Sequence, residues 1–292
     1  MKKTKYFAAC IAAVMALLVM GCGSGDDDEH GIKYDAEKWV IAGTTVIRYI
    51  GVEEDVRVPD GVTVIGESAF TSRGEVVTSV TLPKSVKIIE DNAFEDCNIL
   101  EITYGGTLAQ WCQMGNDGWL VWNATSIKLS DGNDLKSLTT LEIPSGVTKI
   151  GDSAFDSCWD LKSVTIPDSV KSIGDIAFGT CTSLASVTIP GSVKSIGDSA
   201  FGGCTSLESV TIPASVESIG DWAFQNCIKL AEVTIPDSVK GIGNGAFWNC
   251  TSLTEVKYGG TAEQWKQIDI RAVAFPDGVK ITDKDGNEIS NS

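Results

Sequence analysis

Apolar residues recur at a fixed interval along much of this chain. The interval of 23 residues separates the phenylalanines Phe155, Phe178, Phe201, Phe224 and Phe247, and also the prolines Pro144, Pro167, Pro190, Pro213 and Pro236. Such an interval is typical of repeat proteins, whose units pack only on their neighbours. The pattern therefore predicts a stack of similar coils over residues 138–258.

Each repeat reads as a short strand followed by turns. In the repeat that begins at Leu161, Val164 and Ile166 alternate with polar residues, as in a strand with one buried face. Pro167 ends this strand, because proline has no N–H to give to a sheet. One coil cannot bury its apolar face alone. We therefore predict an α/β repeat solenoid with right-handed 23-residue coils and a parallel β-sheet on one face.

Three consecutive repeats carry the same phrase. They read LKSVTIPDSVKSIGDIAFGTC at 161–181, LASVTIPGSVKSIGDSAFGGC at 184–204 and LESVTIPASVESIGDWAFQNC at 207–227. The phrase resembles the leucine-rich repeat of the bacterial surface proteins called BspA-like, and the match is looser around Phe70 and Phe94. The resemblance implies a leucine-rich-repeat arc and, for many members, an extracellular binding role. It supplies no catalytic residues.

A second motif appears twice and interrupts the period. Residues 104–111 (YGGTLAQW) recur 154 positions later at 258–265 (YGGTAEQW). Thr and Gln three apart form a capping box, so each copy is expected to open a short helix that lays its Trp on the core. The strand endings Tyr104 and Ile143 are 39 residues apart instead of 23. We interpret the excess as one oversized coil in a continuous solenoid; two separately capped solenoids are the alternative.

The N-terminus indicates export. Three lysines precede the apolar run 6–20, as in a signal peptide. The sequence before Cys22 resembles a lipobox, in which Cys22 is acylated; an ordinary cleaved signal is the alternative. The acidic run 26–29 resembles the export signals of surface lipoproteins in some Gram-negative bacteria, or is only a solvated charge run. We expect an exported protein that is lipid-anchored to the outer membrane and exposed at the cell surface.

These features divide the chain into segments. We predict a lipoprotein signal peptide at 1–21, an acidic flexible tether at 22–31, an N-terminal cap hairpin at 32–58, first repeats at 56–104, an irregular oversized coil or insertion at 105–137, regular leucine-rich repeats at 138–258 and a C-terminal cap at 259–292.

The charge of the chain excludes several partners. Without the three signal-peptide lysines, 20 basic residues face 39 acidic ones, a net charge of −19. Nucleic acid is not expected as a partner, because phosphate binding needs clustered Lys and Arg. The same charge opposes docking on anionic lipid heads, so the acyl chains on Cys22 are the expected membrane attachment.

Two columns of residues could suggest metals or disulfides. The cysteines from Cys158 to Cys250 fall three residues after each repeat Phe, and we favour buried thiols over disulfides or a metal site. Cys112 is expected to be partly exposed, because Lys266 occupies its place in the second motif. The repeat aspartates are expected to cap one helical turn rather than bind calcium, since Asn244 continues their column.

No catalytic group can be assembled from the sequence. The single histidine, His30, lies in the tether, and no Ser-His-Asp, HExxH, Walker or GxGxxG signature appears. We therefore expect no enzyme activity, no metal and no cofactor.

The outward positions of the strands remain as a candidate binding surface. They form a ladder of small hydroxyls that turns acidic toward the C-terminus: Ser163, Thr165, Ser186, Thr188, Ser209, Thr211, Glu232 and Thr234. Horseshoe repeats commonly bind on their concave sheet. Trp119 and Trp122, in the insertion, are candidate specificity residues. We predict a monomer that binds an extracellular or cell-surface protein or glycan; a structural spacer without a ligand is the alternative.

Overall fold

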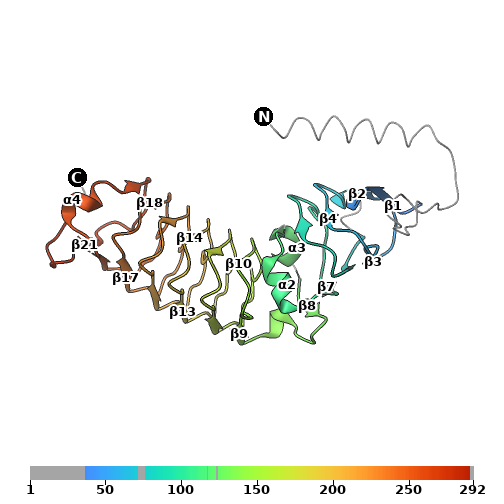
Figure 1. Cartoon of the computed structure of the whole chain (residues 1–292), viewed down its shortest axis with the longest axis horizontal. Coiled ribbons are helices and arrows are strands. Elements are labelled where there is room, and N and C mark those ends of the chain that lie inside the picture. The colour runs from blue at the N-terminus through green and yellow to red at the C-terminus, as the bar shows by residue number, and fades with distance from the viewer. Residues whose placement is uncertain (1–36, 72–75, 117, 123, 290–292) are drawn as a thin grey trace.

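The structure is a computed structural model that describes residues 37–71, 76–116, 118–122 and 124–289. Its strands form four sheets. Figure 1 shows the coils stacked along the length of a bent rod, with two sheets on the inner edge of the bend and two on the outer edge. We call these the inner and outer sheets. The predicted repeat solenoid with a parallel sheet is confirmed.

Apart from the N-terminal hairpin, the inner sheets contain strands of two residues. The first comprises β1 (Trp39–Ala42), β2 (Thr45–Tyr49), β4 (Val64–Ile65) and β6 (Ile88–Ile89), and the second comprises β10 (Lys149–Ile150), β12 (Ser172–Ile173), β14 (Ser195–Ile196), β16 (Ser218–Ile219), β18 (Gly241–Ile242) and β20 (Asp269–Ile270).

The outer sheets contain strands of three or four residues. The first comprises β3 (Asp55–Arg57), β5 (Ser79–Leu82), β7 (Glu101–Tyr104) and β8 (Ser126–Leu129), and the second comprises β9 (Thr140–Glu142), β11 (Ser163–Thr165), β13 (Ser186–Thr188), β15 (Ser209–Thr211), β17 (Glu232–Ile235), β19 (Glu255–Tyr258) and β21 (Lys280–Thr282). Helices α2 (Leu108–Gln113), α3 (Gly118–Trp122) and α4 (Ala262–Trp265) and the 3₁₀ helix η2 (Leu135–Ser137) complete the described elements.

Stacked phenylalanines fill the core of the second half. From Phe155 to Phe247 and on to Phe275, successive ring centroids lie 5.2 to 5.4 Å apart and the ring planes are within 13° of parallel. Each phenylalanine between Phe155 and Phe275 therefore stacks on the rings of both neighbouring coils. At the other end, the ring of Tyr49 from the β1–β2 hairpin lies 5.2 Å from Phe70 and covers the start of the aromatic column.

Both predicted capping boxes are present. Gln264 N donates to Thr261 Oγ1 at 3.3 Å, and Thr261 N donates back to Gln264 Oε1 at 2.8 Å. In α2, Thr107 N donates to Gln110 Oε1 at 3.0 Å. The tryptophan of each helix is buried, as the motif predicted.

The first outer sheet ends with β8, inside segment 105–137. β8 pairs with β7, and beyond it the chain turns back so that Lys128 forms an antiparallel bridge with Asp134. No pairing joins β8 to β9 among the described strands. On the inner edge the main chain keeps contact, because Gly151 N donates to Cys112 O at 2.6 Å.

At the start of the second stack, the indole N–H of Trp111 takes the place of the main-chain N–H that a preceding regular coil would donate. Between regular coils, Phe155 N donates to Ala177 O of the next coil at 2.9 Å. The equivalent carbonyl in the first regular coil, Ala154 O, instead accepts from Trp111 Nε1 at 2.7 Å. The helix α2 is thereby joined to the second stack through a buried side chain.

Lys136 replaces a second main-chain donor. Ser157 N donates to Gly179 O of the next coil, and the equivalent Asp156 O accepts from Lys136 Nζ at 2.8 Å. Burial lowers the pKa of Lys136. Segment 105–137 thus covers the start of the second stack with two side chains.

Replacing Trp111 by Phe tests this junction. The substitution keeps a ring but leaves the buried Ala154 carbonyl without its donor, so we expect a loss of about 1–3 kcal/mol in the free energy of unfolding, measured with urea. Trp265→Phe is the matched control, because Trp265 is also buried but no hydrogen bond of its indole is found in the described chain. Equal losses in the two variants would contradict the assigned role.

Candidate functional site

The predicted hydroxyl ladder lies in register on the second outer sheet. Ser163 pairs with Ser186 and Ser186 with Ser209, and the threonines two residues later pair in the same way. These serine and threonine residues of β11, β13 and β15 are all exposed, whereas the valine between them is buried. The structure therefore presents two straight, parallel columns of hydroxyl-bearing residues.

The acidic end of the ladder is partly neutralised. Glu232, which follows Ser209 in register, accepts from Lys257 Nζ at 2.8 Å, and this contact raises the pKa of Lys257. Glu255 accepts from Thr282 Oγ1 at 3.2 Å. Thr234 remains exposed beside Thr211. Because the Glu232–Lys257 pair is solvent-exposed, it contributes little stability.

The ladder lies on the outer edge of the bend rather than in its hollow. Figure 1 shows β9, β13 and β17 along this outer edge and β10, β14 and β18 along the inner one. The Ser/Thr columns were expected on the concave sheet, but they lie on the convex side of the bend. The inner sheets line the concave side.

The tryptophans of the insertion belong to a helix instead of a loop. Trp122 ends α3 with 56% of its surface exposed, while Leu120 and Val121 are fully buried beneath it. The side chain of Trp119 lies outside the described residues, as do Cys22 and the acidic tether. Of this pair, Trp122 is the residue whose exposed side chain the structure describes.

The aspartate column joins neighbouring coils. Asp175 Oδ1 accepts from Asp198 N at 2.8 Å, and Asp198 Oδ1 accepts from Asp221 N at 2.7 Å. The next residue takes the left-handed conformation, as Ile176 does with φ of 55°, so no helix follows that a carboxylate could cap. The prediction of helix caps is wrong. No cluster of three metal-ligating side chains occurs in the described part of the chain.

The carboxylates fill the space above the repeat glycines. A Cβ atom on Gly197 would lie 2.5 Å from Asp175 Oδ1 and 2.6 Å from the carbonyl carbon of Gly174. A side chain at this position would therefore break the aspartate link between the coils. The glycine of the repeat phrase is explained by this close approach.

The cysteine column consists of buried thiols. Cys181 Sγ donates to Phe155 O of the preceding coil at 3.2 Å, and Cys204 repeats the contact with Phe178 O. Burial raises the pKa of the Cys204 thiol to about 12. The seven described cysteines are buried and form no disulfide, which agrees with the interpretation as thiols.

Cys112 is buried as well, so its expected exposure is wrong. The second stack covers α2, and burial raises the pKa of Cys112 to about 12. Lys266 takes the same place in the second motif, where no described coil follows, and it is exposed. The comparison of the two motifs failed because only one of them is covered by a further stack.

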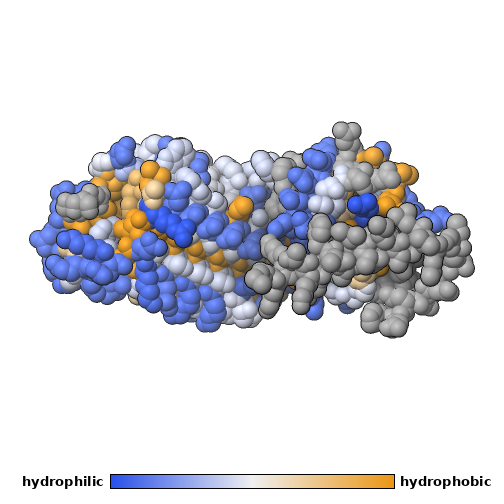
Figure 2. All heavy atoms as spheres, turned by 90° about the horizontal axis from the view of Figure 1, so that it is seen from above, coloured by the Kyte–Doolittle hydropathy of each residue, from blue (hydrophilic) through white to orange (hydrophobic). Residues whose placement is uncertain are grey.

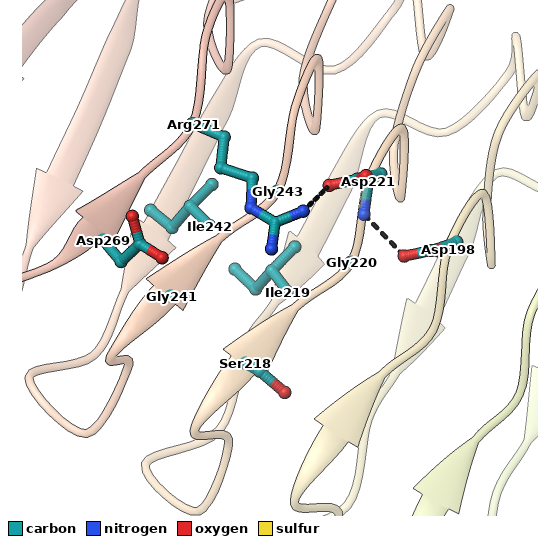
Figure 3. A pocket seen from close by; sticks show the side chains of 10 residues that line it. All are labelled: Asp198, Ser218, Ile219, Gly220, Asp221, Gly241, Ile242, Gly243, Asp269 and Arg271. Carbon is teal, nitrogen blue, oxygen red and sulfur yellow. Dashed lines mark hydrogen bonds and ion pairs between the residues drawn. The ribbon is translucent and has the colours of Figure 1, made fainter. Parts of the chain in front are cut away.

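A hollow of about 320 Å³ opens at the C-terminal end of the second inner sheet. Gly241 follows Ser218 in the strand register and leaves its floor without a side chain. In Figure 3, Arg271 reaches across the hollow and its Nη1 lies 3.4 Å from Asp221 Oδ1. Asp269 and Asp198 also line it, which leaves the hollow with an excess of negative charge.

Comparison with known proteins identifies the repeats. A model of the BspA type leucine-rich repeat region matches residues 52–114 and 125–254 in six copies. The chain belongs to this family. No curated protein matches it.

Several solved structures resemble this BspA-type chain. A leucine-rich repeat protein from Bacteroides ovatus is 25% identical, covering 89% of this chain and 71% of its own, with a TM-score of 0.48. A Leucine Rich Repeat protein of T. pallidum is 24% identical, with coverages of 85% and 92% and a TM-score of 0.37. A leucine rich cell surface protein from Faecalibacterium prausnitzii is 22% identical, with coverages of 86% and 98% and a TM-score of 0.30.

Asp198 tests the link between BspA-type coils. Asp198→Ala removes the acceptor for Asp221 N and should lower the free energy of unfolding by about 1–2 kcal/mol, while Asp198→Asn keeps an acceptor oxygen and should change it by less than about 0.5 kcal/mol. Asp168→Ala, at an exposed turn, is the control for loss of a carboxylate. Urea unfolding with calcium and with a chelator measures all three. A calcium-dependent loss shared by the Ala and Asn variants would contradict the assignment.

Proposed function

We propose that this protein is a non-catalytic, cell-surface binding protein whose Ser/Thr columns contact an extracellular protein or glycan. The observation that carries the proposal is the pair of exposed hydroxyl columns, in register over β11, β13 and β15. Such an array offers both donors and acceptors along its whole length without a large desolvation cost for charges. The family supports a protein-binding surface role.

The proposal includes a lipid anchor at Cys22 and display outside the outer membrane. It is supported by the lipobox-like sequence before Cys22 and by the acidic run that follows. Among the described helices, none has the length and apolar character that crossing a bilayer requires. One solved relative is itself described as a cell surface protein.

A spacer without a ligand is a second candidate function. It is favoured by the uniformity of the ladder, in which three coils present the same Ser-Val-Thr sequence and no aromatic anchor. Trp122, on the separate α3, offers an exposed aromatic side chain and favours binding.

The double substitution Thr188→Lys and Thr211→Lys tests the ladder. Lys257 already occupies this column, so the fold should accept both lysines, while their length and charge should weaken ligand binding at least about tenfold. Binding would be measured on immobilised extracellular-matrix proteins and on glycan arrays. Ser195→Lys, in the inner-sheet column that contains Lys149, is the control. Trp122→Ala tests α3 separately. Unchanged binding in the double lysine variant would reject the Ser/Thr columns as the binding surface, and unchanged binding in Trp122→Ala would reject α3.

Cys22→Ala tests the anchor. Because acylation requires the cysteine thiol, the variant should move from the detergent phase to the aqueous phase in detergent partitioning and should lose labelling by palmitate. Cys97→Ala, a buried repeat cysteine, is the control. Detergent partitioning that is unaffected by Cys22→Ala would show that the anchor assignment is wrong.

A further inference from the structure

Main-chain groups link each coil to the next in a fixed pattern. On the inner sheet, carbonyls point toward the next coil: Lys240 O accepts from Asp269 N, and Ile242 O accepts from Arg271 N, each at 2.9 Å. In the following turn, N–H groups point the same way: Phe247 N donates to Ala274 O at 2.7 Å. Every coil therefore offers acceptors from its short strand and donors from its turn.

The last coil leaves these groups unused within the described chain. Ile268 O and Ile270 O stand where Lys240 O and Ile242 O stand one coil earlier, and no described residue donates to them. Likewise, Val273 N and Phe275 N find no acceptor among the described residues. An open sheet edge of this kind is a template for pairing with another chain.

The neighbouring outer sheet is closed at the same end. Beyond β21, Ile289 N donates to Ile281 O at 2.8 Å, and Thr282 forms an antiparallel bridge with Glu288. A returning segment therefore covers the outer edge, while β20 has no such cover among the described residues. The open groups are confined to the inner strand and the turn that follows it.

A partly apolar hollow of about 420 Å³ lies beside these open groups. Trp265, Ile270, Val273 and Phe275 are among the residues that line it, and Val273 is 60% exposed. Figure 2 shows apolar residues gathered at the C-terminal end of this face of the molecule. The hollow thus offers an apolar surface next to unpaired main-chain donors and acceptors.

Trp265 provides a further unpaired donor. It is 5% exposed and lines the hollow, yet no acceptor for its indole N–H is found in the described chain. Its equivalent in the first motif, Trp111, donates to a main-chain carbonyl of the stack that follows. Trp111 therefore indicates that a main-chain carbonyl of a docked segment is the expected acceptor for the indole N–H of Trp265.

We propose that this open end binds an extended polypeptide segment of another protein, whose main chain continues the inner sheet and the turn. The mid-chain junction is a precedent for a segment that docks on this motif: there the entering segment supplies Gly151 N to Cys112 O of α2 and Ala154 O to Trp111 Nε1. Lys266 and Trp265 hold the corresponding places at the open end. Pairing of the partner's main chain with the open carbonyls of Ile268 and Ile270 is strand addition to a sheet edge.

The junction also indicates the chemistry of the entering segment. A Cβ atom on Gly151 would lie 2.0 Å from Met114 O, so the segment must bring a glycine where the two main chains approach closely. Three residues later, Ala154 is fully buried. The expected partner segment therefore carries glycine followed three positions later by alanine. This site lies apart from the Ser/Thr columns and goes beyond the function proposed for them.

A peptide with the sequence of residues 147–157 (VTKIGDSAFDS) is the probe, because this segment enters the equivalent junction within the chain. Fluorescein-labelled peptide should bind the full-length protein with a Kd on the order of 100 μM, measured by anisotropy. A peptide with Val in place of the glycine is the matched control and should bind at least about fivefold more weakly. Hydrogen exchange should show protection at the amides of Val273 and Phe275.

Two protein variants localise the binding. Trp265→Phe removes the indole donor but keeps a ring, and Val273→Asn removes apolar surface at a residue whose φ of 47° suits asparagine. Each should weaken peptide binding at least about threefold. Ile176→Asn, at the equivalent turn position of an earlier coil and with φ of 55°, is the control. Thr188→Lys with Thr211→Lys should leave peptide binding unchanged, which separates this site from the ladder.

Several outcomes would overturn the proposal. They are equal binding of the glycine and valine peptides, protection elsewhere in the chain, or unchanged affinity in both test variants. Concentration-dependent self-association that is abolished by Val273→Asn would show that a second copy of this chain occupies the open end. It would then overturn the proposal that the occupant is another protein. The two proposals can also fail separately. If the peptide binds as expected but the Thr188→Lys and Thr211→Lys variant binds matrix proteins and glycans as well as the unmodified protein does, this site is supported and the proposed function of the ladder is rejected.

Discussion

Hydrogen bonds between successive coils carry the organisation of this protein. Carbonyls of the inner strands and N–H groups of the turns both point toward the C-terminal neighbour, as Ile242 O and Phe247 N do. A coil can satisfy its main chain and bury its phenylalanine only against another coil. The stack therefore has a direction, and its two ends present different chemical groups. An end requires either a cap or a partner.

The coils could be predicted from the repeat sequence because its apolar positions are the ones that stacking buries. The 23-residue interval, the buried thiols and the two capping boxes could all be predicted from residue type and spacing. The role of Asp198 could not, because a carboxylate before a turn has the same local sequence whether it caps a helix or reaches the next coil. The left-handed conformation of Ile176, which removes the helix, is not evident from sequence, because serine, isoleucine, tryptophan and valine occupy that position as well as asparagine and glycine.

Exposure at the ends of the stacks was equally hard to predict. Cys112 and Lys266 occupy the same place in two copies of one motif, and only the three-dimensional arrangement shows that a further stack covers the first copy. The concave side was also assigned to the wrong sheet, since curvature depends on the relative spacing of coil edges rather than on any residue pattern. The hydroxyl columns were located correctly, but their ligand chemistry is a property of the partner.

The junction at 105–137 has a mechanical consequence. Within the regular stack, every pair of coils is joined by two sheets, whereas at the junction β8 and β9 are not paired and the inner contacts pass through Cys112, Trp111 and Lys136. Under tension applied along the long axis, the load crosses this seam through fewer main-chain bonds than anywhere between β11 and β19. The first and second stacks would separate there before either one unravels, so the seam sets the force at which the molecule lengthens.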